Sequence, residues 1–143
     1  MAQVESKHQL KHREVSKVLY LEPDIAKEVK MPINSKVKGN QGERELSKKL
    51  REHGYCDARR GQQYNGIEGQ DVVGVPGLHI EVKRVEKLNI HNAMEQSKRD
   101  AQPGETPIVA HRRNRTEWLV TMGFDDFIRM RRVYEKEERK NAD

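Results

Sequence analysis

The segment from Asp71 to Val85 constrains the fold of this chain more than any other. Apolar and β-branched residues dominate it, and the run Gly74-Val75-Pro76-Gly77 interrupts it, which is the pattern of two strands joined by a turn. Alternation along the second strand places three polar side chains on one face: His79, Glu81 and Lys83. The segment therefore predicts a β-hairpin at the centre of the fold, with ionisable groups on one side.

The length of the hairpin loop decides whether two acids can act together. A two-residue turn at Pro76-Gly77 pairs Asp71 with Val82, which puts Asp71 and Glu81 on opposite faces. A three-residue loop that also includes Val75 pairs Asp71 with Glu81, at about 5 Å. Adjacent carboxylates repel unless a cation lies between them, and hard oxygen ligands suit Mg²⁺ or Mn²⁺. A shared cation site therefore requires the three-residue loop or a bulge.

The rest of the chain predicts an α/β fold around this hairpin. The expected order is helix, three strands, helix, two strands, helix (α-β-β-β-α-β-β-α), with a mixed central sheet flanked by helices. A helix is expected over 42–54 and strands over 55–59, 71–75 and 78–84, followed by a helix over 89–101, strands over 107–111 and 116–121, and a helix over 124–134. Residues 1–36 form an extra N-terminal arm of unknown role, and the charged segment 135–143 is expected to fray.

Composition limits the kinds of partner and compartment. The 143 residues indicate one domain, and 28 Lys and Arg against 23 Asp and Glu give a net charge of +5. That excess favours a polyanionic partner such as nucleic acid. The single cysteine excludes an intramolecular disulfide, and no apolar run approaches the roughly 18 residues of a membrane span. The composition predicts a soluble, cytoplasmic protein that does not contact a membrane.

A third acid lies on the apolar stripe of the first predicted helix. Glu43 shares a narrow arc with Leu46 and Leu50, where a carboxylate costs several kcal/mol unless it is paired, protonated or bound to a cation. The alternative is a solvated acid near a helix start, favoured by the helix dipole. If this helix covers the face that carries Glu81 and Lys83, the acids converge around a cation that can activate water for phosphodiester hydrolysis.

These residues resemble the PD-(D/E)XK nuclease superfamily, with Glu43 on a first helix, then Asp71, then Glu81-Val82-Lys83 on a strand. The runs Gly42-Glu43-Arg44-Glu45-Leu46 and Ile80-Glu81-Val82-Lys83 look like archaeal-type Holliday junction resolvases. The longer pattern, which adds Arg59-Arg60-Gly61 and the segment 111–115, is similar to small phage and prophage endonucleases. Gln70 stands where the superfamily pattern has Pro. The resemblance implies a restriction-endonuclease-like core over residues 37–134.

The resemblance also implies roles for individual residues. Asp71 and Glu81 would bind Mg²⁺ or Mn²⁺, with the Val82 carbonyl as a further ligand and Glu43 as support for metal or water. Lys83 would be catalytic. Gln96 resembles a polar helix residue that assists some relatives, although helical spacing puts it on the side away from Ala93, Met94 and Ser97.

Two basic and polar clusters are candidates for contact with DNA. The first lies in the loop before the acidic strand and the second at the tip of the last predicted hairpin; a flexible surface loop is an equally good interpretation of the first. The first cluster contains Arg59, Arg60, Gln62 and Gln63, and the second contains Arg112, Arg113 and Arg115. Lys38, from the resolvase-like pattern, is a further candidate.

The leading hypothesis is a divalent-metal-dependent DNA endonuclease that acts on branched DNA, like a Holliday junction resolvase. We expect it to act as a homodimer, because resolving a junction takes two related cuts, in the cytoplasm of a bacterial host or phage-infected cell. The alternatives are a repair or restriction-like DNA nuclease and, in another class, a non-catalytic nucleic-acid-binding domain on a nuclease fold.

Overall fold

The computed structural model describes residues 35–61 and 69–143. Residues 35–143 form one compact unit of the chain. The predictions for the N-terminal arm, apart from its last two residues, and those for Gln62 and Gln63 lie outside the described residues.

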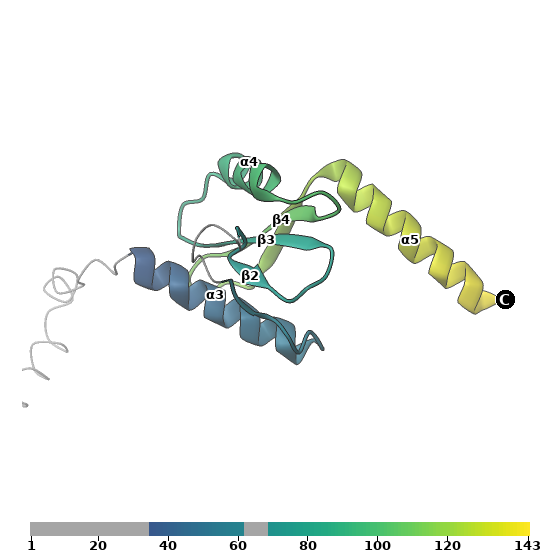
Figure 1. Ribbon diagram of the computed structural model, residues 1–143, viewed down its shortest axis with the longest axis horizontal. Coiled ribbons are helices and arrows are strands. Elements are labelled where there is room, and N and C mark those ends of the chain that lie inside the picture. Colours follow the sequence, from purple (N-terminus) through teal and green to yellow (C-terminus); the bar gives the residue numbers. More distant parts are fainter. Residues whose placement is uncertain (1–34, 62–68) are drawn as a thin grey trace, which may run out of the picture. The chain divides into compact units, whose positions relative to one another are not determined.

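The described residues form a mixed sheet of five strands with helices around it (Figure 1). The strands lie side by side in chain order, and only the β3–β4 pair is parallel. The elements follow one another as the sequence predicts. They are α3 (Ser35–Glu52), β1 (Arg59–Arg60), β2 (Val72–Val73), β3 (Leu78–Arg84), α4 (Ile90–Asp100), β4 (Thr106–Arg112), β5 (Leu119–Met122) and α5 (Phe124–Ala142).

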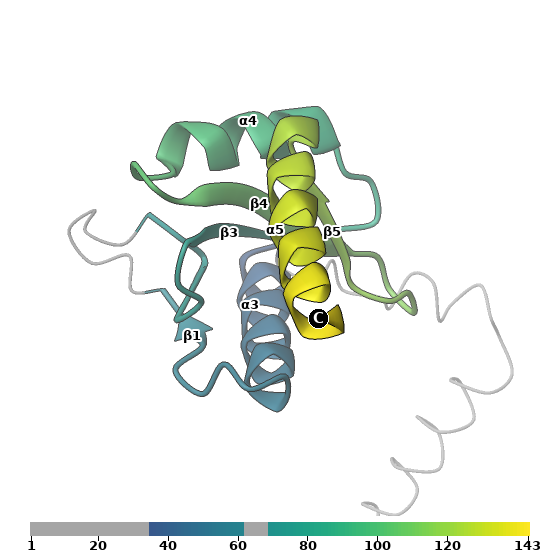
Figure 2. The same ribbon diagram turned by 90° about the vertical axis from the view of Figure 1, so that its right-hand side faces the viewer.

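Two helices cover opposite faces of this sheet (Figures 1 and 2). On the α3 face, Leu46 packs against Ile80 and Val82 of β3 and against buried residues of β2 and β4. On the α4 face, Ala93 and Met94 pack against Val109. Because side chains alternate along a strand, β3 points Leu78, Ile80, Val82 and Arg84 toward α3. Its other three side chains, those of His79, Glu81 and Lys83, point toward α4.

The hairpin has the three-residue loop that a shared acidic site requires. Val72 lies opposite Ile80, so Gly74 lies opposite Leu78 and Asp71 opposite Glu81. The register also brings the Asp71 N–H to the Ile80 carbonyl, 3.2 Å away. The hairpin therefore puts both acids on the face that α4 covers.

Helix α3 begins earlier than expected and ends where expected. It starts at Ser35, seven residues before Gly42, and runs to Glu52. Gly54 follows in the left-handed region at φ 98°, and its N–H bonds to the Arg51 carbonyl, which closes the last turn. Gly42 is therefore inside the helix, where a Cβ would lie 2.9 Å from the Cβ of Arg84. Its missing side chain lets α3 approach β3.

The start of α4 and the end of α5 are each explained by side-chain interactions nearby. Asn89 caps α4 as predicted, because its side chain accepts a hydrogen bond of 3.1 Å from the Asn92 N–H. Helix α5 does not end near residue 134 but continues to Ala142. The charged tail that was expected to fray is helical, with ion pairs one turn apart such as Arg131–Glu135 at 3.4 Å.

Candidate active site

A pair of carboxyl groups lies where β2 begins beside β3. Glu81 is almost completely buried, and the Asp71 carboxyl is within hydrogen-bonding reach of it. The Val82 N–H donates a hydrogen bond of 2.8 Å to Asp71 Oδ2, which fixes the orientation of that carboxyl. The hairpin register therefore produces the acidic pair that the sequence predicts.

Lys83 completes this cluster from the same face of β3. Its Nζ lies 3.0 Å from Glu81 Oε1 and 3.2 Å from Gln96 Oε1. Gln96 comes from α4, so the expectation that it points away from the site is wrong. It is one turn along the helix from the buried Ala93, at the rim of the packed face, from which its longer side chain reaches Lys83.

The pKa of Asp71 is raised by its burial and by its closeness to Glu81. Burial, followed by the charge of Glu81, raises the pKa of Asp71 from 3.8 to about 6. The Val82 N–H and the Lys83 ammonium lower it, but by less. The pair is therefore under-neutralised near neutral pH, which is the electrostatic condition that favours a bound cation.

The donors at this position are hard oxygens, as Mg²⁺ and Mn²⁺ prefer. The N–H and C=O of one residue point to the same edge of a strand. The Val82 carbonyl therefore points to the edge where Asp71 lies. Within residues 35–61 and 69–143, no three His, Cys, Asp or Glu side chains are grouped closely enough to hold a metal by themselves. The protein ligands that fit a cation are two carboxylates and a carbonyl, which leaves positions for water and substrate.

Glu43 does not join the pair. It lies on the α3 face, whereas Asp71 and Glu81 lie on the α4 face, and its carboxylate accepts a hydrogen bond of 2.7 Å from Arg60 Nε. Arg60 also donates to the side chain of Asn40, at 2.8 Å. The cost of a carboxylate on the apolar stripe is offset by an ion pair rather than by a cation.

Several basic residues that were candidates for DNA contact have partners within the protein. Arg60 binds Glu43, Lys38 lies 3.3 Å from Glu86, and Arg112 lies 3.5 Å from Glu45. Arg112 is not at a hairpin tip, because β4 extends to include it and turns its side chain toward α3. Its guanidinium lies 5.8 Å from the ring centre of Trp118, which packs on the core.

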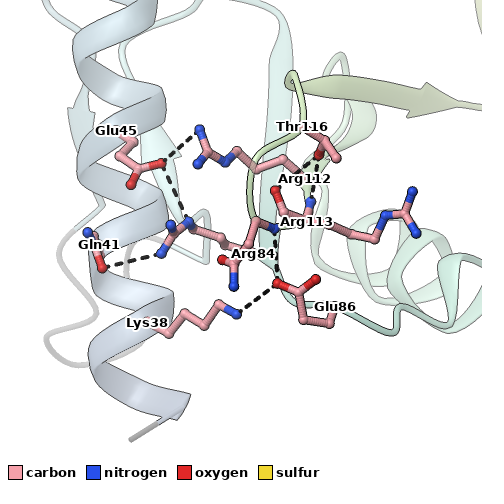
Figure 3. A network of polar contacts seen from close by, with 9 residues as sticks. Lys38, Gln41, Glu45, Arg84, Glu86, Arg112, Arg113 and Thr116 are labelled. Atoms are coloured by element: carbon pink, nitrogen blue, oxygen red, sulfur yellow. Dashed lines mark hydrogen bonds and ion pairs between the residues drawn. The ribbon is translucent and has the colours of Figure 1, made fainter. Parts of the chain in front are cut away.

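Arg112 belongs to a polar network that joins α3 to the sheet (Figure 3). One Glu45 oxygen lies 3.6 Å from Arg84 Nε and 3.5 Å from Arg112, and Gln41 accepts a hydrogen bond of 3.3 Å from Arg84. Beside it, Glu86 accepts a hydrogen bond of 2.9 Å from the Asn114 N–H, which lowers the pKa of the Glu86 carboxyl. The network fixes the carboxyl ends of the parallel strands.

The remaining candidates are exposed. Arg59 lies on β1, and Arg113 and Arg115 lie in the β4–β5 connection. A groove of about 430 Å³ runs between this connection and the start of α4, with Arg113 and His111 on its wall. His111 pairs with Lys83 in the sheet. The groove therefore begins one strand away from the acidic cluster.

Sequence reasoning missed two features near the site. Glu45 had no role predicted from the sequence, but in the structure it is the acid that neutralises Arg84 and Arg112, which are paired neighbours in the β3–β4 register. That pairing follows from the parallel arrangement and could have been found only with the register known. His79 is buried two positions before Glu81, and neither ring nitrogen has a hydrogen-bond partner among the described residues.

Comparisons with protein-family models, with curated proteins and with solved structures find no match for this chain. Among the helices of the described residues, none combines the length and the apolar character needed to cross a bilayer. The fold shown is an α/β fold with a mixed five-stranded sheet flanked by helices. The interpretation of its acidic cluster accordingly depends on the chemistry of the side chains.

Proposed function

We propose that this protein is a divalent-metal-dependent DNA endonuclease. The observation that carries the proposal is the buried Asp71–Glu81 pair beside Lys83. A structural ion pair needs one acid for one base, whereas here two acids lie against each other with one ammonium group. Such an arrangement is costly without a further positive charge, and perturbed acids of this kind cluster at functional sites.

In this proposal Asp71, Glu81 and the Val82 carbonyl hold Mg²⁺ or Mn²⁺. When bound, the cation supplies a Lewis acid for a phosphate and lowers the pKa of an attacking water. The Val82 N–H fixes the orientation of the Asp71 carboxyl, which would hold the cation. Glu43 has no part in holding the cation, because Arg60 already neutralises it.

Lys83 is the catalytic cation of the protein itself. Its side chain keeps 29% of its surface exposed, so the ammonium can meet a substrate phosphate while Glu81 and Gln96 hold it in position. A fixed positive charge next to a phosphoryl group stabilises the charge that develops in the transition state. Gln96 is a positioning residue, because it acts through Lys83.

DNA is the polyanion that fits this chemistry. The net charge of +5 favours nucleic acid. The exposed Arg113 lines a groove that also includes His111, the sheet neighbour of Lys83. The preference for branched DNA comes from the resemblance to Holliday junction resolvases, as does a repair or restriction-like activity as the alternative. We place the activity in the cytoplasm, in accord with a chain that has one cysteine.

The experiment incubates the full chain with a synthetic four-way junction, a linear duplex and single strands, each with Mg²⁺ or EDTA. We expect Mg²⁺-dependent cutting that Glu81→Ala abolishes and that Glu95→Ala, at an exposed acid on α4, leaves intact. Paired symmetric cuts confined to the junction support resolution, and cutting of every substrate indicates a general nuclease. Tight binding without cutting would overturn the proposal in favour of a non-catalytic binding domain.

A further inference from the structure

Helix α5 presents apolar side chains that remain exposed in the described part of the chain. It has 19 residues and buries none of them. Phe127, Met130 and Tyr134 follow one another at spacings of three and four residues, so they form a stripe along one side of the helix. Each has at least half of its surface exposed. In proteins most of the stability of a helix comes from packing of such an apolar stripe against a partner.

The stripe continues onto the edge of the sheet. Strand β5 is the last strand in the sheet order, and its Val120 is 61% exposed on the same side of the sheet as the core residue Ala110. Phe124, between β5 and the stripe, is 75% exposed. An edge strand with apolar side chains is a ready surface for association with another chain.

An apolar groove of about 240 Å³ adjoins the stripe on the α3 side of the sheet. Leu46 and Leu50 of α3, Val120 and Met122 of β5, and Met130 of α5 line it. Because Met130 belongs to both features, the groove and the stripe form one continuous surface. We call this surface, made of Val120, Phe124, Phe127, Met130, Tyr134 and the groove, the α5 face.

We infer that the α5 face is a self-association surface and that its occupant is the α5 face of a second copy of this chain. Five large apolar side chains of this surface are exposed: Val120, Phe124, Phe127, Met130 and Tyr134. At about 100 Å² each they amount to about 500 Å² of apolar surface per copy. Stable dimers bury about 800 Å² per partner, and in homodimers about 65% of that area, or about 520 Å², is apolar.

The α5 face has a protruding part, the helical stripe, and a recessed part, the groove, so two copies related by a two-fold axis can fit together. A helical stripe from one copy can enter the groove of the other, and the same contact is then made twice. The groove lies on the α3 face of the sheet, opposite the face with Asp71, Glu81 and Lys83. Association therefore leaves both acidic clusters open. Resting on the proposed function, such a dimer carries two cutting sites, as a branched substrate requires.

The test measures the mass of the full-length protein by sedimentation equilibrium and compares it with the double variant Phe127→Glu/Met130→Glu. We expect a wild-type dimer and a dissociation constant at least about 100-fold higher in the variant. Lys136→Glu, an exposed change on the other side of α5, should leave the dimer unchanged. Far-UV circular dichroism checks that α5 remains helical in each variant.

A wild-type monomer would overturn the inference, including a monomer in which residues 1–34 of the same chain cover the stripe. A double variant that stays dimeric would also overturn it. Cleavage separates this inference from the proposed function. The dissociated variant should still nick DNA with Mg²⁺ but lose paired cuts, whereas a wild-type dimer with no activity would contradict only the nuclease proposal.

Discussion

At the scale of single residues, the decisive group is the Asp71 carboxyl, whose ionised form is disfavoured by the fold relative to the unfolded chain. Asp71 has a folded-state pKa of about 6 against 3.8 for an ordinary Asp. The folded protein therefore holds this proton more tightly than the unfolded chain does. The stabilisation is fully present below pH 3.8 and is lost as the pH rises through about 6.

Asp71→Asn should remove this pH dependence. In EDTA at pH 8 we expect the variant to be more stable than the wild type by about 1–3 kcal/mol, because its amide is uncharged and can still accept the Val82 hydrogen bond. At pH 3.5 the two should be equally stable. Urea unfolding at both values of pH measures this difference. An Asn variant less stable than the wild type at pH 8 would show that the ionised pair is not strained.

Gln96 should matter for turnover rather than for binding or stability. We expect Gln96→Ala to lower kcat about tenfold or more, with KM for DNA and the unfolding midpoint little changed, because it removes the group that orients Lys83. Gln102→Ala, at an exposed position after α4, is the matched control. Equal rates for Gln96→Ala and the wild type would remove Gln96 from the site.

At the scale of elements, the contact between α3 and β3 fixes the strand that carries the acids. Gly42→Ala should destabilise the protein by about 1–3 kcal/mol, because its Cβ would lie 2.9 Å from the Cβ of Arg84. Gly39→Ala, in the same helix with open space around it, should instead stabilise by about 0.5–1 kcal/mol. Denaturant titration measures both, and the same sign for the two substitutions would contradict this packing.

Local signals were enough to predict the order of the elements. The hairpin, the Asn89 cap and the glycine after α3 could be located because each depends on residues close in sequence. The start of α3 could not be located, because Gly39 and Gly42 are poor helix formers and only packing on Arg84 explains the second. The helical tail was missed because its ion pairs become favourable only once the helix exists.

Part of the candidate site could likewise be predicted from local sequence, and part could not. Asp71, Glu81 and Lys83 could be brought together from the register of one hairpin, since the loop length decides it. Contacts between distant elements could not be predicted. Glu43 meets Arg60 across the α3 face, and Arg112 turns to Glu45 rather than to solvent, since β4 continues one residue beyond its predicted end at residue 111.

At the scale of the whole molecule, the proposed catalytic site and the proposed association surface lie on opposite faces of the sheet. The α4 face carries the acidic cluster and the groove that begins beside it, while the α3 face carries the main core and the apolar groove next to α5. Chemistry and association can therefore change independently by mutation. This separation is what makes the cleavage and sedimentation experiments independent of each other.

The central claim is that Asp71 and Glu81 together bind a divalent cation, and Mn²⁺ titration followed by electron paramagnetic resonance tests it most directly. With full-length protein at pH 8, we expect about one bound Mn²⁺ per chain. Asp71→Asn and Glu81→Gln should each weaken binding about 10- to 100-fold or more, and Glu95→Gln should not. The claim would be contradicted if the wild type bound no Mn²⁺, or if the Asp71 and Glu81 variants bound Mn²⁺ as tightly as the wild type.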